Sequence, residues 1–229
     1  MSTVDSLEDR LNRIRDKRGY LLPHHGLMAV SEPALLEAYD QTYTALTLQQ
    51  RVLPRHDHES VWLAILIAKK ESLATHHIAK FRAAGGSELE FQAILSLVAL
   101  LEGFPAYEFV QQHWQGHMPE LDVRKTYLQA FEDGSADLSE RLAHLCAMAV
   151  HACLGHWQAL AWHITAAYEC SIPEPEVAEA LSLMMFPGSV PDFARAAACW
   201  RQLILDGEVQ ATADFRVWAE ISGQEGYKP

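Results

Sequence analysis

The stretch HIAKFRAAGGSELEFQAILSLVALLEGFP, residues 77–105, sets the pattern on which the fold prediction depends. Its apolar residues recur at intervals of three and four, which is the period of an amphipathic helix. Gly85 ends the first helix, because glycine readily adopts the left-handed conformation that follows many helices. Ser87, with Glu90 three residues later, forms a capping box that starts the next helix, and Pro105 starts a third. The stretch therefore predicts three helices separated by sharp turns.

A second stretch, HITAAYECSIPEPEVAEALSLMMFPGSVP at residues 163–191, follows the same plan. Its His163 lies 86 residues after His77, and the turn residue and closing proline keep the same interval. His144 also lies 86 residues after His58, so a second histidine recurs 19 residues before the first. A repeat at fixed spacing indicates one structural unit that is present twice. We therefore expect two helical units that pack together as a pseudo-symmetric pair.

The chain is predicted to be all-α, because no segment shows the alternation of apolar and polar residues that is typical of a strand. Glycine and proline lie almost entirely at the predicted helix boundaries. The 229 residues are enough to bury a hydrophobic core. We divide the chain into an N-terminal helical segment, a first repeat, a linker helix, and a second repeat with a C-terminal helix: 1–55, 56–119, 120–137 and 138–229.

The composition of the chain excludes some classes of binding partner and indicates a cellular compartment. The formal net charge of −12 argues against nucleic acid and anionic membrane as partners. The apolar runs at 61–68 and 97–101 are too short to span a bilayer. The N-terminus lacks a signal-peptide pattern, and the four cysteines form no C-x-x-C pair. We therefore expect a soluble cytoplasmic protein with free thiols and a small-molecule partner.

The residues HIAKFRAAG at 77–85, with the helix that follows and the G-F-P turn at 103–105, resemble the carboxymuconolactone decarboxylase and AhpD-like family. The signature of that family is a histidine eight residues before a glycine, then a helix and a G-[FY]-P turn. The second stretch is similar at His163 but has Ser171 in place of the glycine. The resemblance implies an all-helical AhpD-like fold, and it covers two stretches: roughly 56–115 and 142–205.

The resemblance also implies an oligomer. Members of the family that contain one copy assemble as trimers, or as hexamers built from dimers. A chain with two tandem copies is similar to a covalently linked dimer. We therefore expect a homo-oligomer, namely a trimer of this chain that looks like the hexamer.

The peroxidases of the family carry two cysteines, four and seven residues before the histidine. The corresponding positions hold Leu73 and Lys70 in the first stretch, and Ala159 and His156 in the second. The decarboxylases usually have a glutamate four residues before the histidine, which is also missing. Because peroxide reduction in this family needs a thiolate and a resolving thiol, we do not expect peroxidase activity by that mechanism.

Histidines take the place of other site residues of the family. The peroxidases have a glutamate 19 residues before the histidine, and this chain has His58 and His144 there. Nineteen residues of unbroken helix span about 28 Å, so each pair of histidines meets only if the chain turns between them. The polar residues 69–72 and Gly155 are the expected turning points.

Our first hypothesis is acid–base chemistry without a cofactor. His77 and His163 would act as general acid or base near neutral pH. Lys70 would supply a cation near a leaving carboxylate, with Glu71 close by. This predicts a lyase or isomerase that acts on a small carboxylated or lactone metabolite.

Two other hypotheses stay open. Neutral imidazoles can bind a divalent metal such as zinc or iron and leave a position open for water or substrate. The candidate ligands for such a site are His144, His156 and His163. His151 is interpreted as a core or interface histidine instead. The third hypothesis is an oligomer that binds a small ligand without catalysis.

Overall fold

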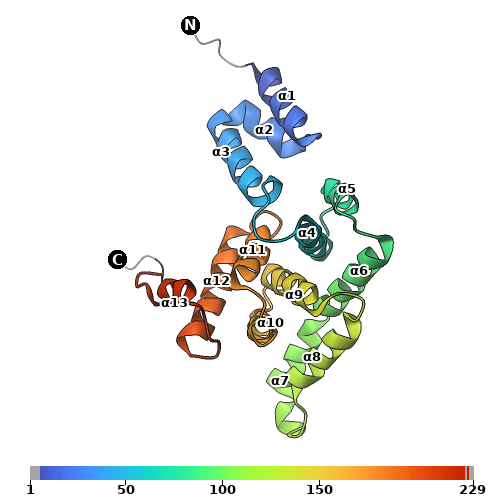
Figure 1. Ribbon diagram of the computed structural model, residues 1–229, viewed down its shortest axis with the longest axis vertical. Coiled ribbons are helices and arrows are strands. Elements are labelled where there is room, and N and C mark those ends of the chain that lie inside the picture. Colours follow the sequence, from blue (N-terminus) through green and yellow to red (C-terminus); the bar gives the residue numbers. More distant parts are fainter. Residues whose placement is uncertain (1–5, 225, 227–229) are drawn as a thin grey trace. The chain divides into compact units, whose positions relative to one another are not determined.

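The computed structural model describes residues 6–224 and Gly226; residues 1–5, 225 and 227–229 lie outside this description. Every regular element in the described part is a helix, so the all-α prediction is confirmed there (Figure 1). A π-helical turn, η1 (Thr44–Leu48), and a short 3₁₀ helix, η2 (Gln115–His117), accompany the α-helices. The α-helices are α1 (Leu7–Arg18), α2 (Pro23–Ser31), α3 (Pro33–Tyr43), α4 (Arg55–Lys69), α5 (His76–Ala83), α6 (Glu88–Glu102), α7 (Phe104–His113), α8 (Val123–Gly134), α9 (Glu140–Leu154), α10 (Trp157–Glu169), α11 (Glu174–Leu183), α12 (Val190–Leu205) and α13 (Ala213–Glu220).

The chain divides into two compact units, Met1–Gln50 and Arg51–Pro229. In the first unit, one buried residue from each of α1, α2 and α3 forms the core: Ile14, Ala29 and Leu36. The second unit contains α4 to α13, and it includes the segments in which the sequence pattern predicts two repeats. All six tryptophans of the chain lie in the second unit.

The helices α4 and α9 pack against each other at the centre of the second unit. Helix α4 also contacts α5 and α6, and α9 contacts α10 and α11. Both central helices are buried on all sides over most of their length, at 58–66 in α4 and at 142–153 in α9. A helix that is buried on all sides belongs to the interior of a protein. The polar side chains within these two stretches therefore lie in the interior of the unit.

After each central helix the chain turns through a residue in the left-handed conformation. Lys70 (φ 55°) follows α4, and Gly155 (φ 75°) follows α9. The turning points predicted within 69–72 and at Gly155 are thus confirmed. The helices that come next, α5 and α10, pack against α4 and α9, respectively.

A second left-handed turn follows α5 and α10. Gly85 (φ 95°) and Ser171 (φ 56°) are each the second residue after the helix, and both have the left-handed conformation. A non-glycine residue in this conformation costs roughly 1–2 kcal/mol. Ser87 then caps α6 and forms the predicted capping box with Glu90.

One stretch, Glu88–His113, is long and apolar enough to cross a membrane, judged by length and composition alone. It consists of two helices, α6 and α7. Helix α6 packs against α4, α8 and α9 and buries one face: Ala93, Ile94, Leu97, Val98 and Leu101. The core helix of a globular unit also passes such a test, and α6 behaves as one.

The segment predicted as a linker helix, 120–137, contains α8. Its side chains Val123, Tyr127 and Phe131 are buried, and the helix packs against α6 and α7. Helix α8 is therefore part of the core as well as a connection, and it supplies Tyr127 to the interior.

Candidate functional site

A buried acid–base pair joins α4 to α5. Nδ1 of His77 lies 2.7 Å from Oε2 of Glu59, and both side chains are buried. The indole of Trp62 stacks on the His77 ring, with ring centroids 4.5 Å apart. The pair forms because the turn after α4 brings α5 back against the helix that carries Glu59.

Three polar atoms of α4 beside this pair are buried without a hydrogen-bond partner in the described part of the chain: Nε2 of His58, Oε1 of Glu59 and Nε1 of Trp62. A buried polar atom without a partner costs about 1–3 kcal/mol. Such atoms are rare in native interiors and are often explained by function or by a bound group. Their concentration within five residues of one helix marks this centre as a candidate for ligand binding.

The electrostatics of the pair favour proton transfer. Burial raises the pKa of Glu59, and the charge of Lys80 partly offsets this effect. Burial also lowers the pKa of His77 well below its usual value, and Lys80 lowers it further. The two pKa values are thus shifted toward each other. Proton exchange between two groups is easiest when their pKa values are similar.

His58, the residue that the 86-residue register pairs with His144, contacts a different group. Its Nδ1 lies 3.0 Å from Oε1 of Glu179 in α11. The other carboxylate oxygen of Glu179 accepts hydrogen bonds from the backbone N–H groups of Val52 and Leu53. Burial alone would raise the pKa of Glu179, but the hydrogen bonds from His58 and the backbone lower it. His58 therefore holds α4 to α11, and Glu59 is the partner of His77.

A continuous row of hydrogen bonds joins five side chains of α8, α9, α10 and the turn before α10. Nδ1 of His144 lies 2.9 Å from Nδ1 of His163. Nε2 of His163 lies 2.7 Å from the hydroxyl of Tyr127, which lies 2.7 Å from Nε2 of His151. Nδ1 of His151 lies 3.1 Å from Nδ1 of His156. Three helices, α8, α9 and α10, and the turn residue His156 thus meet through a single polar network.

Neutral side chains can supply the donor and the acceptor of every hydrogen bond in this network. A neutral imidazole has one donor and one acceptor nitrogen, and a tyrosine hydroxyl both donates and accepts. One assignment donates from His156 through His151 to Tyr127, and from Tyr127 through His163 to His144. Burial lowers the pKa of all four histidines, most strongly for His151 and His163. The network is therefore an uncharged row of hydrogen bonds through the core, and its His156 end is half-buried.

The structure brings together two of the three predicted metal ligands. His144 and His163 contact each other through their Nδ1 atoms, so these two nitrogens face one another. His156 contacts His151 and joins the pair only through His151 and Tyr127. His151, interpreted from the sequence as a core or interface histidine, is fully buried. Its ring also connects Tyr127 to His156 within the hydrogen-bond network.

Lys70 and Glu71, the other predicted catalytic residues, lie on the surface away from these contacts. Nζ of Lys70 lies 3.8 Å from Oε1 of Glu102, and Glu71 accepts a hydrogen bond from the backbone N–H of Leu73. Both residues line a cavity of about 300 Å³. The rest of this lining is mostly apolar: Leu63, Leu66, Ile67, Ser72, Ala74, Thr75, Ile78 and Phe91.

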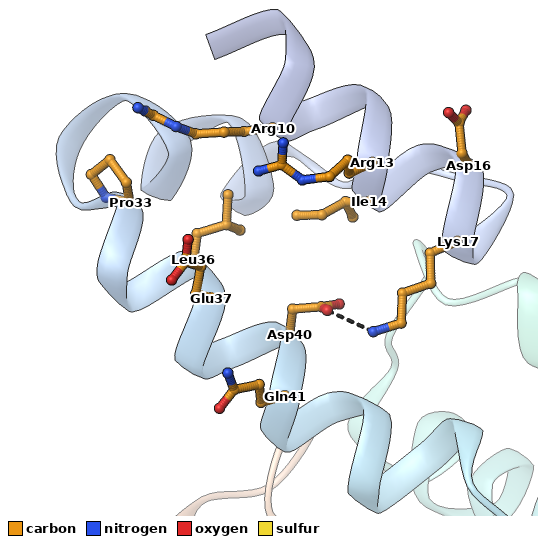
Figure 2. Close-up of a pocket in the computed structure, with 10 residues that line it drawn as sticks. All are labelled: Arg10, Arg13, Ile14, Asp16, Lys17, Pro33, Leu36, Glu37, Asp40 and Gln41. Carbon is orange, nitrogen blue, oxygen red and sulfur yellow. Dashed lines mark hydrogen bonds and ion pairs between the residues drawn. The ribbon is translucent and has the colours of Figure 1, made fainter. Parts of the chain in front are cut away.

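The N-terminal unit has its own cavity of about 470 Å³, lined by α1 and α3 (Figure 2). Basic residues of α1, including Arg10 and Lys17, face acidic residues of α3. Nζ of Lys17 lies 2.7 Å from Oδ2 of Asp40. Because charges of both signs line this cavity and pair across it, it favours no single class of ligand.

Sequence reasoning missed three polar residues of these centres: Glu59, Lys80 and Tyr127. Lys80 lies three residues after His77, on the same face of α5, and this spacing was a usable signal. Glu59 is adjacent to the histidine that the repeat selected. A comparison of the chain with protein-family models, curated proteins and solved structures finds no match.

Proposed function

We propose that this chain is an acid–base enzyme of the carboxymuconolactone decarboxylase-like type. It would act as a lyase or isomerase on a small carboxylated or lactone metabolite. The observation that carries this proposal is the buried Glu59–His77 pair with unpartnered polar atoms beside it. A substrate that contacts these atoms would replace hydrogen bonds that the core leaves unmade.

The pair suits proton transfer at a carbon next to a carbonyl group. In an isomerisation one member removes the proton and returns it at a neighbouring position. In a decarboxylation the bond to the carboxylate breaks, carbon dioxide leaves, and the protonated member of the pair donates its proton to the carbon that keeps the electron pair. The charge of Lys80 acts on both Glu59 and His77, so a developing carboxylate or enolate there would be stabilised. In this proposal Lys80 takes the role that the sequence pattern suggests for Lys70.

We also propose that the second unit is a tandem pair of AhpD-like repeats. Helices α4 to α8 and helices α9 to α13 are two consecutive sets of five α-helices. The contacts of α4 with α5 and α6 correspond to those of α9 with α10 and α11. The paired left-handed turns at Gly85 and Ser171 support the same correspondence.

In this proposal the two halves have different tasks. His163 corresponds to His77, but both of its ring nitrogens already contact other side chains of the network. Glu59 and His58 keep polar atoms without partners. The first half would therefore be the working site, and His163 would be a structural residue that can carry protons.

Hydrogen–deuterium exchange at substrate carbon tests the acid–base role. The full-length protein is incubated in D₂O with a panel of lactones and keto acids, and exchange is followed by proton NMR. We expect exchange in at least one compound, and we expect Glu59→Gln and His77→Gln to lose it at least 100-fold. Glu71→Gln makes the same substitution at a surface carboxylate, so it is the matched control and should retain exchange.

Two outcomes would overturn the proposal: no exchange with any member of the panel, or full exchange in both Glu59→Gln and His77→Gln. Tryptophan fluorescence of each variant verifies that the second unit is folded. The homo-oligomer that the family resemblance implies also stays a prediction, and sedimentation of the full-length protein measures it.

A further inference from the structure

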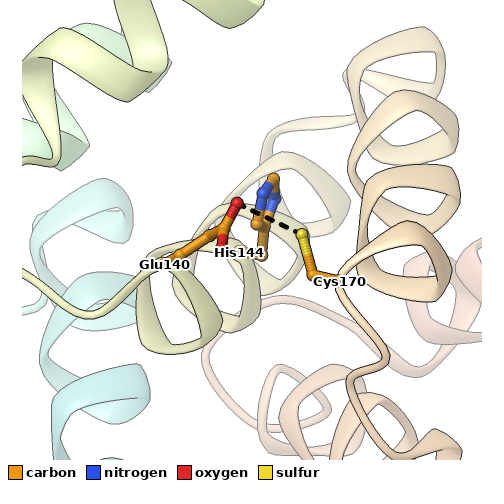
Figure 3. Close-up of side chains that lie close together, drawn as sticks. All are labelled: Glu140, His144 and Cys170. Carbon is orange, nitrogen blue, oxygen red and sulfur yellow. Dashed lines mark hydrogen bonds between the residues drawn. The ribbon is translucent and has the colours of Figure 1, made fainter.

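A third polar cluster lies on the surface side of His144, away from the Glu59–His77 pair. Glu140 and His144 are one helical turn apart on α9, so they share a face. Cys170 caps the end of α10 and reaches the same place (Figure 3). One candidate ligand atom from each side chain lies within 4.8 Å of the other two.

The spacing of these atoms is close to that of a metal site. Sγ of Cys170 lies 3.2 Å from Oε1 of Glu140. Zinc binds sulfur at about 2.3 Å and oxygen at about 2.1 Å, which places the two ligands of a tetrahedral ion about 3.6 Å apart. The Glu140 and Cys170 atoms need to move apart by a few tenths of an ångström, and the imidazole needs to approach by up to about 1 Å, to complete the geometry.

The charges around the cluster favour a cation. The carboxylates of Glu140, Glu169 and Glu132 lie close enough for their charges to act on the Cys170 thiol. Three carboxylates around one thiol create a negative potential, which attracts positive ions. A bound divalent ion would hold Cys170 as the thiolate, as metal ions do for coordinated cysteines.

We propose that Glu140, His144 and Cys170 bind a divalent metal ion, and that zinc is the ion that fits best. Imidazole, thiolate and carboxylate together suit zinc better than magnesium or calcium, which prefer oxygen ligands alone. Three protein ligands leave a fourth position for water or a small molecule. Glu140 is exposed and Cys170 is partly exposed, so the ion can enter from solvent.

His163 would support this site from behind. Metal-bound histidines commonly use their other ring nitrogen for a hydrogen bond that fixes the ring. Nδ1 of His144 already lies 2.9 Å from Nδ1 of His163, which is held in turn by Tyr127. When Nδ1–H of His144 donates to His163 and the other hydrogen bonds of the network run in the same reversed direction, Nε2 of His144 carries no proton, and the network orients it for an ion. This proposal is independent of the proposed function, because it uses none of the residues around His77.

Cobalt(II) is the probe for the test, because a cobalt–thiolate bond gives a charge-transfer absorption band. Chelator-treated full-length protein is titrated with Co²⁺, and Zn²⁺ affinity is measured by competition with a chromophoric chelator. We expect one ion per chain with micromolar or tighter affinity. We expect Cys170→Ala to abolish the band and Glu140→Gln to weaken binding at least tenfold.

Matched controls separate this site from the alternatives. Cys199→Ala removes another partly exposed thiol and is expected to leave the band unchanged. His156→Ala is expected to bind as the parent protein does, whereas a three-histidine site would lose the ion. Glu59→Gln, which the proposed function predicts to lose exchange, should keep the cobalt band, so the two proposals fail separately.

Three results would overturn the metal site. The first is a charge-transfer band that persists in Cys170→Ala. The second is binding that is lost in His156→Ala but kept in Cys170→Ala. The third is an adventitious ion only, seen as millimolar affinity without a thiolate band. Tryptophan fluorescence of each variant verifies its fold, so that loss of binding is not mistaken for unfolding.

Discussion

The centres around His77 and His163 each contain one histidine of the pair that lies 86 residues apart in the sequence, but different residues surround the two histidines. Nδ1 of His77 contacts a carboxylate, Glu59, whereas Nδ1 of His163 contacts another imidazole, His144. The first centre keeps buried polar atoms without partners. The second centre continues through Tyr127 into a row of hydrogen bonds that ends at His156.

This difference shows how one helical framework can produce two chemical environments. A carboxylate beside a neutral imidazole has two groups whose pKa values can be matched for proton transfer. A row of neutral imidazoles has no carboxylate hydrogen-bonded within it, and it fills the interior without charge. The distinction predicts that the second centre contributes more to stability and the first more to catalysis.

Removal of the two histidines is expected to give the largest difference. His163→Ala leaves a cavity in a fully buried region and breaks hydrogen bonds to His144 and Tyr127. We expect it to lower the free energy of unfolding by about 4 kcal/mol. His77→Ala also leaves a buried cavity and removes the stack on Trp62, but it breaks one hydrogen bond where His163→Ala breaks two. It should cost about 2–3 kcal/mol, because Glu59 can take up a proton when its partner is lost.

Urea unfolding followed by tryptophan fluorescence measures both values, since all six tryptophans lie in the second unit. His156→Ala, at the half-buried end of the same network, is the control and should cost about 1 kcal/mol. Equal costs for His163→Ala and His77→Ala would remove the distinction between a structural and a catalytic centre.

The middle of the network is tested by Tyr127→Phe. This change keeps the ring but deprives Nε2 of His151 and Nε2 of His163 of their shared partner. Two buried nitrogens without partners should lower the free energy of unfolding by about 2–3 kcal/mol. Tyr107→Phe is the matched control, because Tyr107 packs edge-to-face on Tyr127 and its ring is kept. A loss as small as that of the control would show that the hydroxyl of Tyr127 contributes no net stability.

A smaller effect per residue is expected in the pH dependence of stability, where the variant tests the contribution of one histidine. Burial lowers the pKa of His77, His144, His151, His156 and His163 in the folded protein. Below the unfolded value of about 6.5, the unfolded chain therefore binds more protons than the folded one, and stability falls as the pH falls. Each such histidine contributes up to about 1.4 kcal/mol per pH unit.

Urea unfolding at several values between pH 7.5 and about pH 5 measures this slope. Glu59 acts in the opposite direction, because burial raises its pKa and protonation then favours the folded state. His156→Gln should make the slope shallower by the share of one histidine. A slope that is the same in this variant would mean that His156 keeps an ordinary pKa in the folded protein.

Much of the fold could be predicted from sequence, because helix boundaries depend on local residues. The capping box at Ser87 and the turn at Gly155 were both predicted, and both depend on residues within one helical turn. The linker helix was predicted as an element, but its buried face was not. Burial depends on contacts with α6 and α7, which no local pattern describes.

The site was predicted less well, and the reason is a shift of one residue. Helix α4 begins at Arg55 and α9 at Glu140, so the central helices correspond at an interval of 85 residues, whereas the histidines correspond at 86. Glu59 and His144 are each the fifth residue of their helix and therefore occupy the same phase. The repeat interval alone selected His58, whose side chain points to α11 instead.

The left-handed turns of the second unit show what holds the path of the backbone. The turn after α4 has Lys70 and the turn after α9 has Gly155; the turn after α5 has Gly85 and the turn after α10 has Ser171. Two of these four turns thus have no glycine. A penalty of roughly 1–2 kcal/mol for each non-glycine turn is small beside the packing of two buried central helices. Packing can therefore hold a backbone path that its own residue does not favour, and a search of the sequence for glycine finds only half of these turns.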